Sequence, residues 1–382
     1  MYRLYSTQCD EKGLEKVSVD KYRKVFDYDF NLGFHRPKKD QCEICIAHKN
    51  RQGFSTDEDN QVYESHMKNK VMTREMKDKA KLDACNSQTN TACAFDMRQI
   101  LLCPHGRIST FFYKRRLGVY NLTVYDYKKG DAYWFMWPES EGRRGSNEVA
   151  TCLFKYIEVQ TRQGVKDIIM FSDNCAGQNR NRFVAFALNF AREHFHLNSL
   201  THVFLEKGHT ETENDSVHAT IERKVRNIQI YSPEQWFTAV RTARVSKRPY
   251  VVTEMTCSDI IDFKGMALKV RNLTIDDNGG KMSWSKVRQV LVKADDLSAI
   301  HIKTCYDGQP QRLGLNRRKR VSGGADAPSM ELLKGISKPG IPELKKRDML
   351  ALCNSGQIPA SYRAFYESLP IGGETDDSAT ED

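Results

Sequence analysis

The sequence predicts an α/β protein in which a mixed sheet is covered by helices on both faces. Two apolar runs, residues 119–127 and 131–137, flank residues 128–130 (KKG), and this spacing is typical of two strands joined by a short hairpin loop. Strand-like and helix-like segments then alternate over residues 147–229, as they do where helices connect parallel strands. With 382 residues and 40% hydrophobic content, the chain can bury cores of this kind.

The individual elements follow in order along the chain. One strand is predicted before the hairpin, over ACAFDM at residues 92–97. A helix is predicted from about Asn147 to Arg162, because Ser and Asn stand at its start and a glycine follows its end. The remaining elements are a strand at residues 167–173, a helix at 180–195, a strand at 199–208 and a helix at 214–229.

Changes in composition divide the chain into five parts. Residues 1–90 are polar and lysine-rich, and an exposed helix is predicted over residues 59–84, which lack a broad apolar face. The predicted parts are a zinc-binding and helical module at 1–90, the α/β domain at 91–256, a β-rich region at 257–315 with strands at 267–275, 287–294 and 299–306, a basic joint and helical pair at 316–370, and a disordered acidic tail at 371–382.

The charge of the chain favours a polyanionic partner. The formal net charge is +10, and the last nine residues contain five acids and no base, so the rest of the chain carries +15. A basic body of this kind favours nucleic acid, although many basic proteins simply have solvated lysine faces.

Location is predicted from what the sequence contains and lacks. No run approaches the roughly 18 apolar residues of a membrane span, and residues 1–20 have no signal-peptide core, so no membrane partner is expected. The basic run RRKRV at residues 317–321 is compatible with nuclear import, which makes the nucleus the expected location. Whether the chain forms a homo-oligomer stays open.

Three acidic positions are predicted to meet at one edge of the sheet. Asp173 ends an apolar run, where a buried strand would emerge. In the helix predicted to begin near Asn214, Asp215 and Glu222 lie on one edge, separate from the apolar stripe. Asp96 is a charged residue in an otherwise apolar strand, which is costly unless it is paired or bound to metal.

Each acid also has an ordinary structural interpretation. Asp173 suits a helix-capping turn, and Asp215 suits the first turn of a helix, where the dipole favours an acid. Asp96 can be an ion-paired edge residue, and Asp126 or Asp131 in the hairpin could take its place. The joint placement, rather than any single acid, favours a metal site.

Three converging carboxylates predict two Mg²⁺ or Mn²⁺ ions. The ions would offset the repulsion between the acids, and hard oxygen ligands suit these metals rather than zinc. Two such ions clamp the attacking and leaving oxygens of a phosphoryl displacement. The residues expected to contact nucleic acid or orient groups nearby are Gln178, Asn179, Arg180, Arg182, His209 and His218. An ordinary helix cap is the alternative for the amides, and a structural hydrogen bond is the alternative for the histidines.

A CEIC motif predicts a zinc site in the amino-terminal part. Cys42 and Cys45 have the spacing that lets two thiolates reach one Zn²⁺ from a tight turn. His35 and Cys9 are the expected completing ligands, with His48 as a substitute. Unliganded thiols are the alternative, because eleven scattered cysteines in an intracellular chain are expected to stay mostly reduced.

Several stretches resemble the motifs of transposon-derived animal proteins, a group similar to transposases and integrases with an RNase H-like catalytic domain of the DDE or DDD type. These stretches are FNLGFHRPKKDQCEIC, FDMRQILLCP, GRRGSNEVATC, FSDNCAGQNRNRF and FLEKGHTETENDSVHATIER. The resemblance covers most of the chain and is most specific between Phe95 and Arg223.

The resemblance implies an RNase H-like domain over residues 91–256 with three metal-binding acids. By position these are Asp96, Asp173, and either Asp215 or Glu222. One departure is an insertion at residues 99–118, where a plain RNase H fold would turn tightly. The abrupt start of the chain also predicts a further DNA-binding segment outside it.

The expected function is that of a transposase-derived, divalent-metal-dependent polynucleotidyl transferase or nuclease acting on DNA. The alternative is a domesticated, catalytically inactive protein of the same fold that binds nucleic acid or chromatin. A scaffold whose acids are merely solvated is a weaker third possibility.

Overall fold

A computed structural model describes residues 1–29, 41–51, 53–245, 248–269, 273–277, 279–315 and 336–372. The chain divides into two compact units, Met1–Asn50 and Arg51–Asp382. The boundary lies earlier than the predicted one at residue 90, so the long helix that follows residue 50 belongs to the unit that contains the sheet. Three sequence features lie outside the described residues: His35, the RRKRV run and the acidic tail from residue 373.

The first unit consists of short helices with an aromatic cluster. Rings of Tyr2, Tyr5 and Tyr22 lie with centroids 5.1 to 5.8 Å apart, and Cys9 is buried. Its described elements are α1 (Tyr2–Glu11), α2 (Val19–Lys24), the π-helix η1 (Val25–Asp29) and α3 (Glu43–Asn50).

The second unit is built on a ten-stranded mixed sheet, which confirms the predicted mixed α/β class. The strand order is β10-β9-β8-β6-β5-β1-β3-β4-β7, with β2 paired to β3. The strands are β1 (Asn90–Met97), β2 (Leu101–Cys103), β3 (Leu117–Asp126), β4 (Ala132–Pro138), β5 (Asp167–Ser172), β6 (Ser199–Phe204), β7 (Val251–Glu254), β8 (Gln289–Lys293), β9 (Ala299–Lys303) and β10 (Gln311–Gly314).

Parallel and antiparallel pairs divide this sheet as the hairpin and the alternating segments predict. β3 pairs antiparallel with both β1 and β4, whereas β5 lies parallel between β1 and β6. β8 then pairs antiparallel with β6, so β8 to β10 extend the same sheet instead of forming a region of their own.

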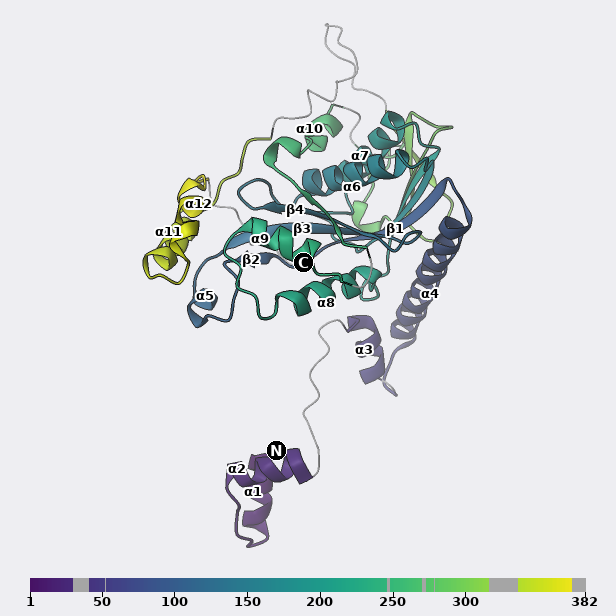
Figure 1. Ribbon diagram of the computed structural model, residues 1–382. Helices are drawn as coiled ribbons and strands as arrows, with labels where there is room; N and C mark the ends of the chain where they lie inside the picture. The colour runs from purple at the N-terminus through teal and green to yellow at the C-terminus, as the bar shows by residue number, and fades with distance from the viewer. Residues whose placement is uncertain are drawn as a thin grey trace. The chain divides into compact units, whose positions relative to one another are not determined.

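Helices cover both faces of the sheet (Figure 1). One face packs against α6 (Ser146–Thr161), α7 (Arg182–His194) and α10 (Phe263–Ala267), which share a core with the sheet. The other face packs against α8 (Glu213–Val225) and α9 (Pro233–Arg241). The strand predicted at residues 267–275 is wrong in its described part, because Asp262 caps α10 by accepting the Gly265 N–H at 2.9 Å.

A 30-residue helix, α4 (Asp57–Asn86), runs along the sheet at β1 (Figure 1). The helix begins at a capping box in which Thr56 and Asp59 exchange side-chain and backbone hydrogen bonds. Its small residues Ala80 and Ala84 are buried against Ala92 and other core residues, which lets the helix approach the strands closely. The predicted exposed helix is therefore exposed on one side only, because a narrow stripe of small residues buries the other.

The segment between β1 and β3 forms local structure of its own. β2 adds to β3, and α5 (Ser109–Tyr113) follows it before the chain enters β3. Near the end of the described chain, α11 (Glu343–Asn354), the turn η5 (Ala360–Tyr362) and α12 (Arg363–Ser368) form the predicted helical pair. Lys345 of α11 contacts both carboxylate oxygens of the buried Glu139 at 2.7 and 2.6 Å, which holds this pair to the sheet.

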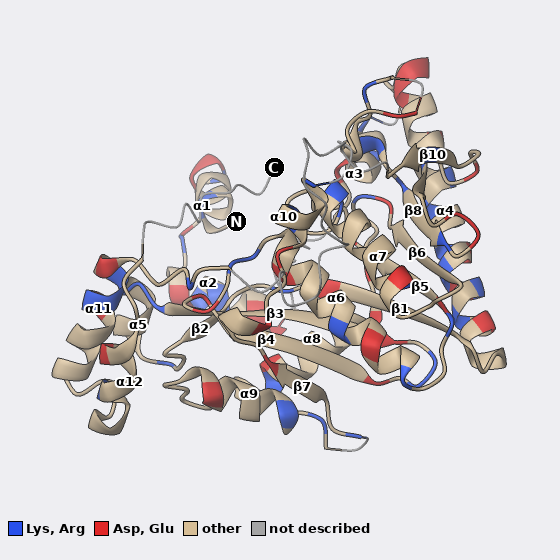
Figure 2. Cartoon of the chain, turned by 90° about the horizontal axis from the view of Figure 1, so that it is seen from above, with Lys and Arg blue, Asp and Glu red and all other residues tan. Residues whose placement is uncertain are grey.

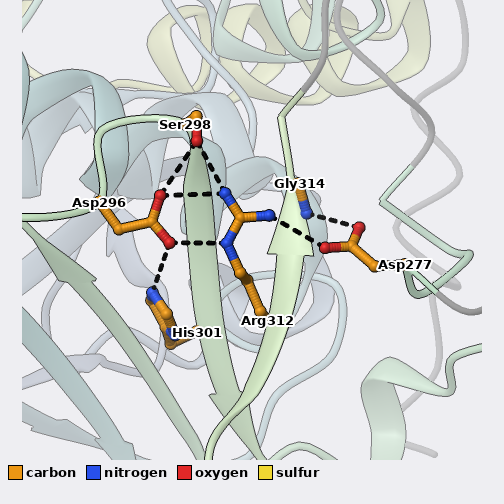
Figure 3. A network of polar contacts seen from close by, with 6 residues as sticks. All are labelled: Asp277, Asp296, Ser298, His301, Arg312 and Gly314. Carbon is orange, nitrogen blue, oxygen red and sulfur yellow. Dashed lines mark hydrogen bonds and ion pairs between the residues drawn. The ribbon is translucent and has the colours of Figure 1, made fainter.

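An arginine-centred network fastens the last described strand (Figure 3). Arg312 of β10 donates to Asp296 at 2.7 and 3.1 Å and to Asp277 at 3.1 Å. Asp277 also accepts the Gly314 N–H, and His301 lies 3.1 Å from Asp296. The network joins β9 and β10 to the turn before β9 and to Asp277, which precedes β8 in the chain.

Candidate metal-dependent active site

Strand register brings two of the predicted acids together. β1 and β5 are parallel neighbours in which Ala94 pairs with Phe171. Asp96 and Asp173 each stand two residues further along, so they follow on the same side of two adjacent strands, which lie about 4.8 Å apart. Asp173 comes directly after Ser172, the last residue of β5, and both acids are partly buried.

Helix α8 brings the third acid to the same edge. The helix packs against β1 and β3, and its His218 ring lies 3.1 Å from the hydroxyl of Thr123. Thr123 is the partner of Asp96 across the sheet. Asp215 stands three residues before His218, on the same face of the helix and one turn nearer its start.

The charges of these acids act on one another. Burial and the negative charges of Asp173 and Asp215 raise the pKa of Asp96 to about 7. Burial also raises the pKa of Asp173, although the Cys175 N–H and the Asn179 amide oppose the shift by hydrogen bonding to the carboxylate. Three carboxylates held together in this way favour a bound proton or a bound cation.

Asp215, rather than Glu222, joins the other acids. Glu222 has a side chain that is 66% exposed and forms an ion pair with Arg98, whose guanidinium also donates to the carbonyl of His218 at 3.1 Å. Asp215 accepts the Thr212 N–H at 3.0 Å as part of a capping box. The helix-start role considered for Asp215 is therefore present, and it fixes the carboxylate beside the acid edge.

The two hairpin acids lie elsewhere. Asp126 is fully buried and accepts hydrogen bonds from the Tyr156 hydroxyl and the Gln160 amide, both at 3.0 Å. Asp131 pairs with Arg248 at 3.3 Å. Both carboxylates have structural partners, so neither takes the place of Asp96.

The loop after β5 orients Asp173. The buried Asn179 donates its side-chain amide to Asp173, and Arg180 donates to Asn174 at 2.9 Å. Helix α7 is capped by Asn181, which accepts the N–H groups of residues 183 and 184. Asn179 therefore orients the acid, and the helix-cap alternative is wrong for it because Asn181 caps α7. Its contact with nucleic acid stays a prediction.

Two other residues predicted to contact nucleic acid, Gln178 and Arg182, lie in this loop and at the start of α7. Gln178 is partly exposed, and its carbonyl accepts from Asn181 at 3.2 Å. Arg182 lies over the ring of Phe183, with 4.8 Å to the ring centroid.

Two arginines that the sequence did not single out, Arg98 and Arg144, line the same edge beside the predicted Arg180. Arg144 donates to the carbonyl of Arg98 at 3.3 Å, and burial lowers the pKa of Arg98. The buried Nε atoms of Arg144 and Arg180 have no hydrogen-bond partner among the described residues, and neither has the side-chain amide of the fully buried Asn214. Unsatisfied donors beside acids suit an anionic ligand such as a phosphate. The sequence indicated Arg180, and Arg98 stands only two residues after Asp96, but nothing in the sequence indicated Arg144.

A second group of side chains could hold a metal ion. Cys42 and Cys45 lie at the start of α3, His66 lies in α4, and His209 lies in the loop before α8. One ligand atom from each of these four residues lies within 4.8 Å of the others.

This group corrects the predicted ligand set. Cys9 and His48 do not belong to it, and His35 lies outside the described residues. His66 and His209 take their places, and their rings lie 5.1 Å apart. Nδ1 of His66 also lies 3.1 Å from the carboxylate of Glu206, the kind of outer contact that orients a metal-binding histidine.

Sequence comparison finds one partial match. A family model described as "Domain of unknown function (DUF7869)" matches residues 122–277. The matched segment contains Asp173 and Asp215 and begins after Asp96. No curated protein and no solved structure matches the chain. Among the described residues, none of the helices combines the length and the apolar character needed to cross a membrane.

Proposed function

We propose that this chain is a transposase-derived, divalent-metal-dependent polynucleotidyl transferase or nuclease that acts on DNA. The observation that carries the proposal is the register of β1 and β5, which sets Asp96 and Asp173 side by side while α8 brings Asp215 to them. Acids from three separate elements meet here without a lysine or arginine paired to any of them among the described residues.

The donor set fits Mg²⁺ or Mn²⁺. Carboxylate oxygens are the ligands these hard cations prefer, and three acids leave room for the two ions of a phosphoryl-transfer site. When bound, such ions supply a Lewis acid and lower the pKa of a coordinated water or hydroxyl. Asp96, Asp173 and Asp215 would hold them.

The remaining residues of the site orient the acids and offer hydrogen-bond donors to a phosphodiester. Asn179 holds the Asp173 carboxylate in one orientation, and His218 holds α8 against the strand that carries Thr123. Arg144 and Arg180 offer unsatisfied N–H donors to the phosphate oxygens. The positive net charge of the chain agrees with a DNA substrate, as does the nuclear location predicted from residues 317–321.

A metal-dependent DNA cleavage and strand-transfer assay tests this function. Wild type should act on DNA with Mg²⁺ or Mn²⁺ but not with EDTA, and Asp173→Asn should lose this activity. Glu158→Gln is a matched control, because Glu158 is an acid on α6 that pairs with Arg162 on the same helix. Equal activity of wild type and Asp173→Asn contradicts the proposal, and binding without cleavage by wild type supports the domesticated DNA-binding alternative.

We also propose that the cysteine and histidine group binds Zn²⁺. Two thiolates and two imidazoles form a common tetrahedral zinc set, and the Cys42–Cys45 spacing suits it. Zinc measured by elemental analysis should be one ion per wild-type chain and should fall in Cys42→Ser and in His66→Asn. Cys85→Ser is the control, since Cys85 is an exposed thiol outside the group. Unchanged zinc in both ligand variants contradicts this assignment.

A further inference from the structure

The insertion between β1 and β3 presents two large aromatic side chains to solvent. Phe112 is 80% exposed and Tyr113 is 82% exposed, at the end of α5. Their ring centroids lie 5.4 Å apart with the planes at 84°. Adjacent exposed aromatic rings are unusual on a surface without a binding role.

Packing and hydrogen bonds hold the segment that carries these rings against the rest of the protein. Phe111, the residue before them, is buried in the core that α8 and α9 form with the sheet. The backbone of His105 exchanges two hydrogen bonds with Ile230, at 2.7 and 2.9 Å, and Trp236 donates to the carbonyl of Leu102 at 3.1 Å. The two exposed rings are therefore held outward by a fixed support.

Positive charge surrounds the rings. The stretch RISTFFYKRR, residues 107–116, contains four cationic residues and no acid. Lys114 and Arg115 share Asp348 of α11 at 3.2 and 3.0 Å, whereas Arg107 and the exposed Arg347 form no ion pair within the described residues. Figure 2 marks the lysine and arginine positions of this stretch and of α11 in blue.

The insertion lies on the same edge of the sheet as the three acids. β3 runs antiparallel to β1, and its Thr123 pairs with Asp96. The insertion joins β3 at Leu117, six residues before Thr123, which is about 20 Å along a strand.

We propose that Phe112 and Tyr113 stack on unpaired bases of the DNA substrate, while Arg107 and its neighbours hold the backbone. Aromatic rings combined with cations are the usual means of binding single strands or opened duplexes. Arg107 and Arg347, which form no ion pair among the described residues, favour an anionic partner such as the DNA backbone. This inference rests on the proposed function and narrows its substrate to DNA with an unpaired segment.

Equilibrium binding in EDTA tests the inference without any cleavage. Fluorescence anisotropy compares a single strand, a duplex with a five-nucleotide unpaired bubble and a fully paired duplex of the same sequence. Wild type should prefer the first two, and a Phe112→Ala/Tyr113→Ala variant should bind them at least tenfold more weakly while its affinity for the paired duplex changes little. Phe54→Ala is the control, since Phe54 is a 91% exposed aromatic outside the insertion.

A second variant reports stacking directly. Tyr113→Trp should keep the affinity for the single strand, and its added tryptophan fluorescence should be quenched on binding. Equal affinity of wild type and the double alanine variant for the bubble overturns the inference. A double variant that changes only the monomer–dimer equilibrium in light scattering also overturns it and assigns the rings to a second copy of the chain.

The two proposals fail separately. Preferential binding of the bubble that depends on the two rings, without metal-dependent cleavage, keeps this inference and rejects the catalytic function. Metal-dependent cleavage that does not change in the double variant on any of the three DNAs rejects this inference and keeps the catalytic function.

Discussion

The Nε2 atom of His218 lies 3.1 Å from the Oγ1 atom of Thr123, and Thr123 is the cross-strand partner of Asp96. This contact joins the helix that carries Asp215 to the strands that carry the other acids. Burial and the charge of Arg98 lower the pKa of His218 to about 3, so the ring is neutral at physiological pH. It acts here as a hydrogen-bonding residue that positions the helix.

His218→Ala should therefore weaken Mn²⁺ binding and cleavage by about tenfold, the lower end of the range for outer partners of metal ligands. His218→Gln should recover part of the loss, because its amide can still bond to Thr123. Calorimetric Mn²⁺ titration and the cleavage rate measure both effects. The contrary outcome is a wild-type cleavage rate that changes with pH around a pKa near 6.5 and no longer does so in His218→Gln. That result would show that the ring changes charge during the reaction.

Asn179→Ala should lower the cleavage rate about tenfold, because the Asp173 carboxylate loses the amide that orients it. Asn198→Ala is the matched control, since Asn198 donates its side-chain amide at 3.0 Å to Asp167, an acid at the opposite end of β5. The rates are compared at saturating Mn²⁺, with circular dichroism to confirm folding. Equal rates for Asn179→Ala and wild type would remove Asn179 from the site.

Asp96→Asn should stabilise the metal-free protein at pH 8. A carboxyl whose pKa is raised on folding to about 7 keeps a proton that the unfolded chain loses near pH 4, so the fold loses stability as pH rises from about 4 to 7. The asparagine removes this cost, which is on the order of 4 kcal/mol at pH 8 and absent below pH 4.

Urea unfolding in EDTA at pH 4 and pH 8 measures this difference. Glu158→Gln, the surface variant already used as a control, should show no comparable dependence on pH. The same difference between Asp96→Asn and wild type at both pH values would contradict the prediction.

Arg312→Gln should lower the unfolding midpoint slightly at pH 7. Hydrogen bonds from Arg312 hold the pKa of Asp296 down to about 2, so this network stabilises the fold above pH 4 and loses its effect as pH falls through 2. Because the groups are exposed, 1 M NaCl should reduce the difference between variant and wild type. A difference that is unchanged at pH 2 would assign the effect to packing instead of charge.

Much of the fold was predictable because hydrophobic periodicity and turn residues indicate its strands and helices locally. The β3–β4 hairpin follows from two apolar runs around a short loop, and α6 begins and ends within one residue of the predicted bounds. The strands β7 and β10 were missed because each has only four residues, too few for a clear alternation. In its described part, the strand predicted at residues 267–275 is wrong, because Asp262 caps a helix that extends to Ala267.

The group of Cys42, Cys45, His66 and His209 shows what local sequence patterns do not indicate. The spacing of Cys42 and Cys45 indicates half of a site, but nothing near them in the sequence indicates His66 or His209. His66 lies in a lysine-rich helix that seemed exposed, and His209 seemed to belong to the acids because it precedes Asp215 by only six residues. Distance along the chain was a poor guide to distance in space.

The sequence by itself determined the order of strands and helices, the basic charge and the candidate acids, because these follow from periodicity and residue type. Only the tertiary structure decided that the charge of Asp215 acts on Asp96 and raises its pKa, while Glu222 pairs with Arg98. It also decided that Asp126 accepts hydrogen bonds from Tyr156 and Gln160. The reason is that strand register and helix rotation select which side chains meet, and both are set by packing across the whole sheet rather than by neighbouring residues.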